Sequence, residues 1–159
     1  MRTEKRLCRW ESPIGTLAVA EGGAGISDLF LCEQDVPFGF REEATPLLRE
    51  AVRQLAGYFA GERKEFSLPL SLNGTPFQLA DWKTLCTIPY GQTRSYRQIA
   101  EQVGSPKGFR AIGMANHSNP VMIVIPCHRV IAADGSLGGY ACGLDAKRFL
   151  LALEQAHSN

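Results

Sequence analysis

Two threonine–proline pairs mark the starts of two helices, and they constrain the fold more than any other feature of the chain. In Thr45-Pro46 and Thr75-Pro76, the threonine side chain can cap a helix and the proline favours its first turn. The first pair predicts a helix that Gly61 ends, with one apolar stripe formed by Leu48, Val52, Leu55 and Phe59. The second pair predicts a helix that carries Leu79, Trp82 and Cys86 on one face.

The segments around the first helix favour β-structure. The runs GTLAVAE and GISDLFLCE flank Gly22-Gly23, which predicts a hairpin over residues 15–33. The run EFSLPL, residues 65–70, predicts one more strand. The stretch SLNGT, residues 71–75, is typical of a linker. We therefore expect a small mixed domain of strands and one helix over residues 1–72.

Helices predominate after the linker. Ser95 and Gln98 have the spacing of a capping box, and the apolar positions that follow at helical spacing are Tyr96, Ile99, Ala100 and Val103. The tripeptide GSP breaks this helix, and a second short helix is predicted over about 107–116. Such a pair, joined by a turn that contains glycine, indicates a helix-turn-helix. A last helix is expected from about Asp145, with an inward face of Ala146, Phe149, Leu150 and Leu153. The predicted fold is α+β, with a mainly helical domain over 73–159.

Composition excludes several classes of protein. No uncharged apolar run approaches the roughly 20 residues that span a bilayer. The charged segment Met1 to Trp10 lacks the apolar core of a secretory signal. The five cysteines include no C-x-x-C pair, and an odd number without a signal favours free thiols in a reducing compartment. We expect a cytoplasmic protein, and a monomer because no coiled-coil seam is present.

The hexapeptide IPCHRV, residues 125–130, contains the most reactive side chains. Cys127 and His128 follow Pro126 at the end of the apolar run 121–125, where the chain turns polar. A free cysteine is most often a buried, inert core residue. A thiol with a pKa of about 8.5 becomes a nucleophile when a nearby base or cation lowers that value. In an extended chain adjacent side chains point apart, so a direct contact between Cys127 and His128 requires a bend, and a bridging water is the alternative.

These residues resemble the active-site region of the O6-alkylguanine-DNA alkyltransferases, the methylated-DNA–protein-cysteine methyltransferases. The resemblance rests on PCHRV, on SNPVMIVI before it and DGSLGGYACGLDAKRFLLALE after it, and on the upstream run GTPFQLADWKTLCTIPYGQTRSYRQIAEQVGSPKGFRAIG. It covers about residues 75–154. It implies a small ribonuclease-H-like domain before a helix-turn-helix domain. It also implies repair of double-stranded DNA that contains O6-alkylguanine, by transfer of the alkyl group to the protein itself.

The resemblance assigns the reacting groups. Cys127, as thiolate, attacks the alkyl carbon, His128 takes the thiol proton through a water, and Glu154 orients that histidine. On helix pattern alone, Glu154 reads as a surface residue. Asn119 ties its turn to the cysteine-bearing segment, although an Asn before Pro is also ordinary turn chemistry. The alkyl group remains on Cys127 because a thioether is a poor leaving group, so each molecule acts once and needs no cofactor.

The resemblance also assigns the substrate pocket. The Tyr96 hydroxyl donates to N3 of the guanine that leaves as an anion, although its helical position alone favours a core residue. The backbone at Ala141, beside Tyr140, faces O6, and the carbonyl of Val130 reads the exocyclic amine. Cys142 stands where the family usually has glycine, and it is expected to narrow the space for the alkyl group.

The DNA-binding residues fall on and near the helix-turn-helix. On pattern alone, Arg110, Gly113, Met114 and His117 form a solvated helix face opposite Phe109 and Ile112. The resemblance places this face in the minor groove, with Arg110 filling the stack that the extruded base leaves. Met114 replaces a smaller residue of the family. Around this helix, the further contacts expected with DNA are Arg94, Ser95 and Lys107, and residues 93–110 carry four basic side chains against Glu101 alone.

Two alternative functions are kept in view. A pure DNA-binding module that senses alkylated bases would lack the reactive Cys127. A cysteine hydrolase using Cys127 and His128 would be expected to bring its histidine from far along the chain. The zinc site of the mammalian members is not expected here, because the three histidines, His117, His128 and His157, are all C-terminal.

Overall fold

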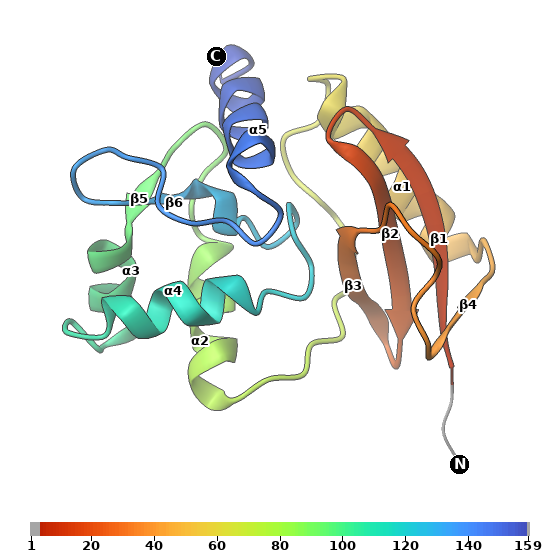
Figure 1. Cartoon of the computed structure of the whole chain (residues 1–159), viewed down its shortest axis with the longest axis horizontal. Coiled ribbons are helices and arrows are strands. Elements are labelled where there is room, and N and C mark those ends of the chain that lie inside the picture. Colours follow the sequence, from red (N-terminus) through yellow and green to blue (C-terminus); the bar gives the residue numbers. More distant parts are fainter. Residues whose placement is uncertain (1–3, 159) are drawn as a thin grey trace. The chain divides into compact units, whose positions relative to one another are not determined.

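The computed structural model describes residues 4–158 (Figure 1), so the first three residues of the charged N-terminal segment and Asn159 lie outside it. The described chain divides into two compact units, one ending at Leu72 and the other beginning at Asn73. Among the described residues, no helix is both long enough and apolar enough to cross a bilayer.

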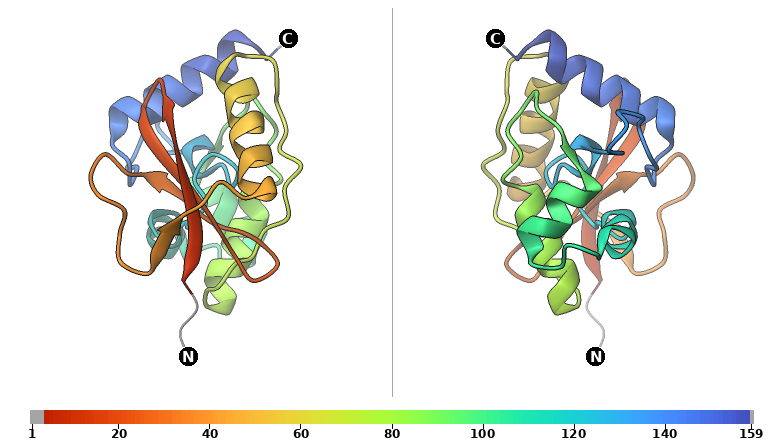
Figure 2. Two further views of the ribbon diagram at one scale, coloured as in Figure 1. Left: turned by 90° about the vertical axis from the view of Figure 1, so that its right-hand side faces the viewer. Right: turned by 90° about the vertical axis from the view of Figure 1, so that its left-hand side faces the viewer.

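The first unit is a four-stranded sheet with one helix on a face of it (Figures 1 and 2). The strands are β1 (Lys5–Ser12), β2 (Gly15–Gly22), β3 (Gly25–Leu31) and β4 (Phe40–Glu42), in the order β3-β2-β1-β4. The pairs β1–β2 and β2–β3 are antiparallel, and β1–β4 is parallel. The predicted hairpin is therefore confirmed as β2 and β3, while β1 and β4 were not predicted from the sequence.

The strand predicted over residues 65–70 is wrong. Only Leu70 forms an isolated parallel bridge, to Ile26. The Ile26 N–H donates to the Pro69 carbonyl at 2.8 Å. Pro69 has no N–H to donate in return, which limits further pairing of this segment.

Helix α1 (Pro46–Phe59) begins as predicted, because the Thr45 side chain accepts the N–H of Leu48. Its buried face is rotated from the predicted stripe, however. The buried apolar residues are Leu48, Ala51, Leu55 and Tyr58, which follow the 3.6-residue period, whereas Val52 and Phe59 are half-buried at the edge.

The second unit is mainly helical. Its helices are α2 (Pro76–Leu85), α3 (Tyr96–Val103), α4 (Phe109–His117) and α5 (Leu144–Ala156), with a 3-10 turn, η1, over Cys127–Arg129. The short strands β5 (Arg94–Ser95) and β6 (Val130–Ile131) pair in parallel. Complete capping boxes start α2, through Thr75 and Gln78, and α3, through Ser95 and Gln98. The predicted α+β class with a C-terminal helical domain is confirmed.

Helices α3 and α4 pack side by side as a helix-turn-helix. Gly104 ends α3 with a φ of 86°, a left-handed conformation that favours glycine. Ile112 of α4 is buried, but Phe109 is 42% exposed, so the prediction that Phe109 lies on the inner face with Ile112 is wrong. Phe109 is the first residue of α4, so no preceding helical turn covers its side chain.

Two other predicted helix faces need correction. In α2, Trp82 is buried as expected, but Leu79 and Cys86 are exposed, and the other two buried residues are Asp81 and Leu85. In α5, Ala146 and Leu150 are buried and Phe149 is 38% exposed. The positions that complete the buried face of α5 are held by Lys147 and Glu154. Charged residues thus occupy interior positions that apolar patterning assigns to hydrophobic ones.

Candidate active site

Cys127 opens the 3-10 turn η1 directly after the apolar segment 121–125. The Asn119 side chain holds this segment in shape. Its Nδ2 donates to the carbonyl of Ile125 at 2.7 Å and to Cys127 Sγ at 3.2 Å, and its Oδ1 accepts the N–H of Val121 at 2.9 Å. Asn119 therefore fixes the position of the sulfur relative to the turn that precedes it.

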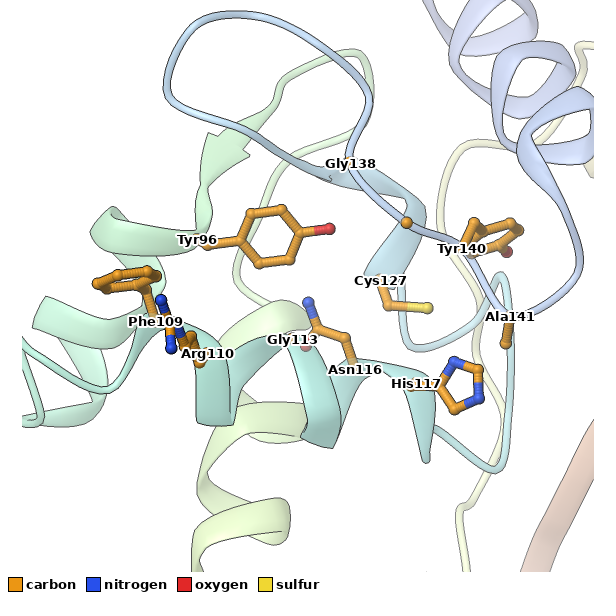
Figure 3. A pocket seen from close by; sticks show the side chains of 11 residues that line it. Tyr96, Phe109, Arg110, Gly113, Asn116, His117, Cys127, Gly138, Tyr140 and Ala141 are labelled. Carbon is orange, nitrogen blue, oxygen red and sulfur yellow. The ribbon is translucent and has the colours of Figure 1, made fainter.

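A cavity of about 340 Å³ lies beside the thiol, formed wholly within the second unit (Figure 3). Its walls come from α3, α4, the turn η1 and the loop before α5. The lining residues are Tyr96, Phe109, Arg110, Gly113, Asn116, His117, Cys127, Gly138, Gly139, Tyr140 and Ala141. A volume of this size is in the range of pockets that hold small molecules, so the cavity can admit a single planar base next to Cys127.

His128 points away from the cavity into a buried charge cluster. Its Nε2 lies 2.7 Å from Glu154 Oε2, and Arg129 donates to the same carboxylate from Nε at 2.8 Å and from Nη2 at 3.0 Å. Arg129 also donates to the carbonyl of Ile88 at 2.7 Å. The 3-10 turn makes this arrangement possible, because it bends the chain so that consecutive side chains reach α5.

This cluster sets the protonation of the histidine. Burial would raise the pKa of Glu154, but the hydrogen bonds from His128 and Arg129 outweigh it and lower that pKa to about 2. Burial lowers the pKa of His128, although Glu154 opposes the shift. A neutral imidazole beside an ionised carboxylate carries its proton on Nε2. Nδ1 is then an acceptor, and it is buried without a hydrogen-bond partner among the described residues.

The resting state of the thiol differs from the expectation of a thiolate. Burial raises the pKa of Cys127 to about 11, and the hydrogen bond from Asn119 offsets only part of that rise. The side chain is 7% exposed, so water stabilises the anion poorly. Cys127 is therefore protonated at neutral pH.

Lys147 is a buried cation that sequence reasoning missed. Its Nζ donates to the carbonyls of Val130 at 2.6 Å, Leu137 at 2.5 Å and Gly139 at 3.1 Å. Burial lowers its pKa to about 8, and an ionised Cys127 would oppose that shift. The ammonium thus fastens the loop over the cavity to α5. The Val130 carbonyl, predicted to read a base, also accepts from this lysine.

Tyr96 projects from the first turn of α3 into the cavity (Figure 3). Burial raises the pKa of its hydroxyl, which stays a donor at neutral pH. A Cβ on Gly138, whose φ is +69°, would lie 2.6 Å from that hydroxyl, so only glycine fits there. A Cβ on Gly113 would meet only Tyr96, at 3.9 Å. Packing within the unit does not require glycine at position 113. Because Gly113 has no side chain, the cavity wall stays open there.

The predicted DNA-binding residues differ in exposure. Arg110, Lys107 and Met114 are exposed, and Met114 is 75% accessible. Arg110 also lines the cavity. Arg94 instead folds back on its own loop, where Nη1 donates to the Thr93 carbonyl at 2.8 Å. Ser95 is committed to capping α3.

Tyr140 and Ala141 line the cavity, whereas Cys142 does not. Cys142 Sγ lies 3.4 Å from the sulfur of Met122 instead. Among the described residues, no three His, Cys, Asp or Glu side chains are grouped so that they could hold a metal ion.

Comparison with known proteins places this arrangement in a family. Residues 76–156 match the model of the 6-O-methylguanine DNA methyltransferase DNA binding domain, and residues 5–72 match the ribonuclease-like domain of the same enzymes. The chain belongs to the 6-O-methylguanine DNA methyltransferase family. The two matches together cover both compact units, so membership of this methyltransferase family extends over nearly the whole chain.

Individual members of the family are closely similar. The methylated-DNA–protein-cysteine methyltransferase of Methanosarcina barkeri is 49% identical over 91% of this chain and 94% of its own length. The constitutive enzyme of Bacillus subtilis is 49% identical over 91% of this chain and 92% of its own. The structure of Mycobacterium tuberculosis OGT in complex with DNA superimposes with a TM-score of 0.88 at 46% identity, covering 98% of this chain and 94% of that one.

Proposed function

We propose that this protein repairs double-stranded DNA by moving the alkyl group of O6-alkylguanine onto its own Cys127, once per molecule. The observation that carries the proposal is the setting of that thiol. Cys127 is buried except toward a cavity of about 340 Å³ and adjoins a neutral histidine that is paired with an ionised glutamate. No chemistry in this scheme requires a cofactor. We expect a monomer that acts in the cytoplasm.

Proton transfer accompanies the attack. Cys127 Sγ forms a bond to the alkyl carbon as the bond from that carbon to O6 breaks, and the thiol proton passes to His128 Nδ1 through one water. Glu154 stabilises the imidazolium that forms, because its ionised carboxylate lies 2.7 Å from Nε2. A thiol that ionises only during attack is protected from other electrophiles until a substrate fills the cavity.

The leaving guanine receives its own stabilisation. The Tyr96 hydroxyl donates to ring N3 and offsets the negative charge that develops on the base. The backbone at Ala141 faces O6, and the Val130 carbonyl has a second lone pair for the exocyclic amine beside its bond to Lys147. Asn119 keeps the sulfur in line with the alkyl carbon.

Helix α4 is the proposed DNA-contacting element. The thiol is reached only through the cavity, so the damaged nucleotide has to leave the duplex to react. Arg110 is exposed at the cavity rim and, among the described residues, makes no hydrogen bond or ion pair, so its guanidinium can fill the vacated stack. Gly113 lets the backbone approach the minor groove, with Met114 and Lys107 beside it.

The first prediction concerns Arg110. Arg110→Ala should lower the rate of transfer from a duplex containing O6-methylguanine by about tenfold or more, because nothing then stabilises the extruded base. Transfer from the free base O6-benzylguanine should change less than twofold. Single-turnover assays on both substrates measure this, and Arg97→Ala, an exposed arginine on α3, is the matched control. Equal losses on both substrates would contradict the assigned role.

The second prediction concerns Cys142. Cys142→Gly should raise the rate with O6-benzylguanine by about threefold or more, since removing Cβ and Sγ lets the loop beside Cys127 widen. Transfer of a methyl group should stay within about twofold. Equal rates of transfer from O6-benzylguanine for the wild type and Cys142→Gly would contradict the prediction that Cys142 restricts bulky adducts.

Titration of the protein with a lesion-bearing duplex tests the proposed function. The expected result is an endpoint of one alkyl group per protein molecule, with guanine restored in the DNA. A protein that only senses lesions would bind without changing the DNA, and a hydrolase would turn over an ester or amide substrate repeatedly. Either of these results would refute the proposal.

A further inference from the structure

A buried carboxyl lies behind the cavity and has no part in the mechanism above. Asp81 of α2 is 0% exposed, and α2 packs against α3, α4 and the turn η1. The neighbouring Trp82 donates from Nε1 to the Ala115 carbonyl at 2.9 Å, which fixes α2 against α4. Asp81 is therefore held rigidly beneath the helix that forms one wall of the cavity.

Asp81 faces the amide of Asn116. With the amide nitrogen directed at the carboxyl group, Nδ2 donates to Asp81 Oδ2 at 2.6 Å, to Asp81 Oδ1 at 3.3 Å and to the Ile112 carbonyl at 3.2 Å. The reverse orientation would place the amide oxygen against these acceptors. An ionised Asp81 accepts only, so it determines which way the amide of Asn116 is turned.

The other end of Asn116 reaches the cavity. Figure 3 shows its side chain directed between Tyr96 and Cys127, and the residue lines the cavity wall although it is only 8% exposed. With the amide turned as its hydrogen bonds require, the atom at the tip is Oδ1. The wall of α4 thus offers a hydrogen-bond acceptor to whatever base lies against the thiol.

The ionisation of Asp81 controls this orientation. Burial raises its pKa, and the donation from Asn116 Nδ2 described above opposes that rise. The turn η1 contributes one titratable neighbour, Cys127, whose pKa the charge of Asp81 raises. From α4 the facing group is Asn116, and the buried side chains of α3, Ile99 and Ala100, carry no charge. Once protonated, Asp81 can donate to the amide oxygen, and the remaining preference for the inward Nδ2 comes from the Ile112 carbonyl.

We propose that Asp81 is a positioning residue of the alkyl-transfer site, which through Asn116 presents an amide oxygen to the base in the cavity. This inference rests on the proposed function. Asp81 touches neither the base nor the sulfur. It acts on the base through Asn116, and its charge acts separately on the pKa of Cys127.

A double-mutant cycle tests the coupling. Single-turnover rate constants on a duplex with O6-methylguanine are measured for the wild type, Asp81→Leu, Asn116→Leu and the double variant. Asp81→Leu and Asn116→Leu should each slow transfer by about threefold to tenfold, the size expected for one hydrogen bond, and the double variant should be no slower than Asn116→Leu. If Asp81→Leu slows transfer by the same factor whether or not Asn116 is present, the proposal is wrong.

The pH profile gives a readout that a purely structural role would not move. The ratio of the wild-type rate to the Asn116→Leu rate should be about threefold to tenfold where Asp81 is ionised, and it should fall toward one as the pH is lowered through the pKa of Asp81. Asp81→Asn keeps the size of the side chain but cannot ionise, so its ratio should stay constant. A constant wild-type ratio would overturn the proposal.

Controls separate this inference from protein folding and from the proposed function. Thermal unfolding establishes that each variant is folded at the assay temperature, and the double variant should be the most stable of the leucine variants because it leaves neither buried polar partner unpaired. Asp145→Leu removes an exposed carboxylate from α5 and should leave the rate unchanged. If the wild type transfers no alkyl group, the proposed function fails; if it transfers but the cycle is additive, only this inference fails.

Discussion

Replacing Cys127 with serine should abolish alkyl transfer, with a loss of more than about a thousandfold, while binding of the lesion-bearing duplex should stay within about threefold of wild type. A hydroxyl is a far weaker nucleophile than a thiol, and the same buried setting that raises the thiol pKa to about 11 opposes an alkoxide still more strongly. The proposed duplex contacts belong to α4, which this substitution leaves unchanged. Single-turnover transfer and a DNA-binding titration measure the two quantities separately.

Cys142→Ser is the matched control for this substitution. It changes the other thiol near the cavity, whose sulfur is directed at Met122, and it should retain transfer within about twofold. Transfer that survives in Cys127→Ser and disappears in Cys142→Ser would show that the acceptor had been assigned to the wrong sulfur.

Glu154→Gln should lower the free energy of unfolding by about 3–5 kcal/mol, more than any other single substitution named here. Glu154 is 1% exposed and accepts bonds from His128 and Arg129, and the backbone N–H of Gly91 lies 3.3 Å from the same carboxylate. Glutamine keeps the shape but removes the negative charge, which leaves the Arg129 guanidinium buried without a counter-ion. Transfer should fall by at least about tenfold, because the tautomer of His128 is no longer fixed.

The pH dependence of the free energy of unfolding shows whether Glu154 stabilises the protein through its negative charge or only through the shape of its side chain. The pKa of Glu154 is lowered from 4.5 to about 2 in the folded protein, so its contribution is present above pH 4.5 and is lost as the pH falls toward 2. The wild type should lose roughly 3 kcal/mol across that window through this group, and Glu154→Gln should lose none of it. Glu101→Gln, at an exposed position of α3, is the control. Parallel stability curves for the wild type and Glu154→Gln would contradict the assigned charge.

Local signals in the sequence predicted the elements that depend on local chemistry. Thr45, Thr75 and Ser95 cap their helices through the bonds that the sequence indicates, because a cap involves only residues within three positions. Strand β4 escaped prediction because it forms by parallel pairing with β1, which is distant in the sequence, whereas β1 itself pairs with the adjacent β2. Lys5 lies opposite Phe40, and no local signal connects those two residues.

The buried charges of the site could not be read from helix patterns. Glu154 and Lys147 lie on the buried face of α5 because each has hydrogen-bond partners there. Arg129 donates to Glu154, and Lys147 donates to backbone carbonyls of residues 130–139. Each of these partners is eight or more residues away in the sequence, so a helix pattern does not reveal it. The apolar pattern of α2 assigns Asp81 to a polar, exposed position. Asp81 can nevertheless be buried because the amide of Asn116 donates a hydrogen bond to its carboxyl group. Resemblance to the family identified Glu154, whereas nothing in the sequence indicated Asp81 or Lys147.

Peptide mass analysis after reaction with a duplex containing O6-methylguanine tests the central claim most directly. The account predicts that the peptide carrying Cys127 gains the mass of one methylene group in every reacted molecule, and that the peptides carrying the other four cysteines gain none. Guanine restored in the DNA with an unmodified Cys127 peptide, or the added mass on any other residue, would contradict it.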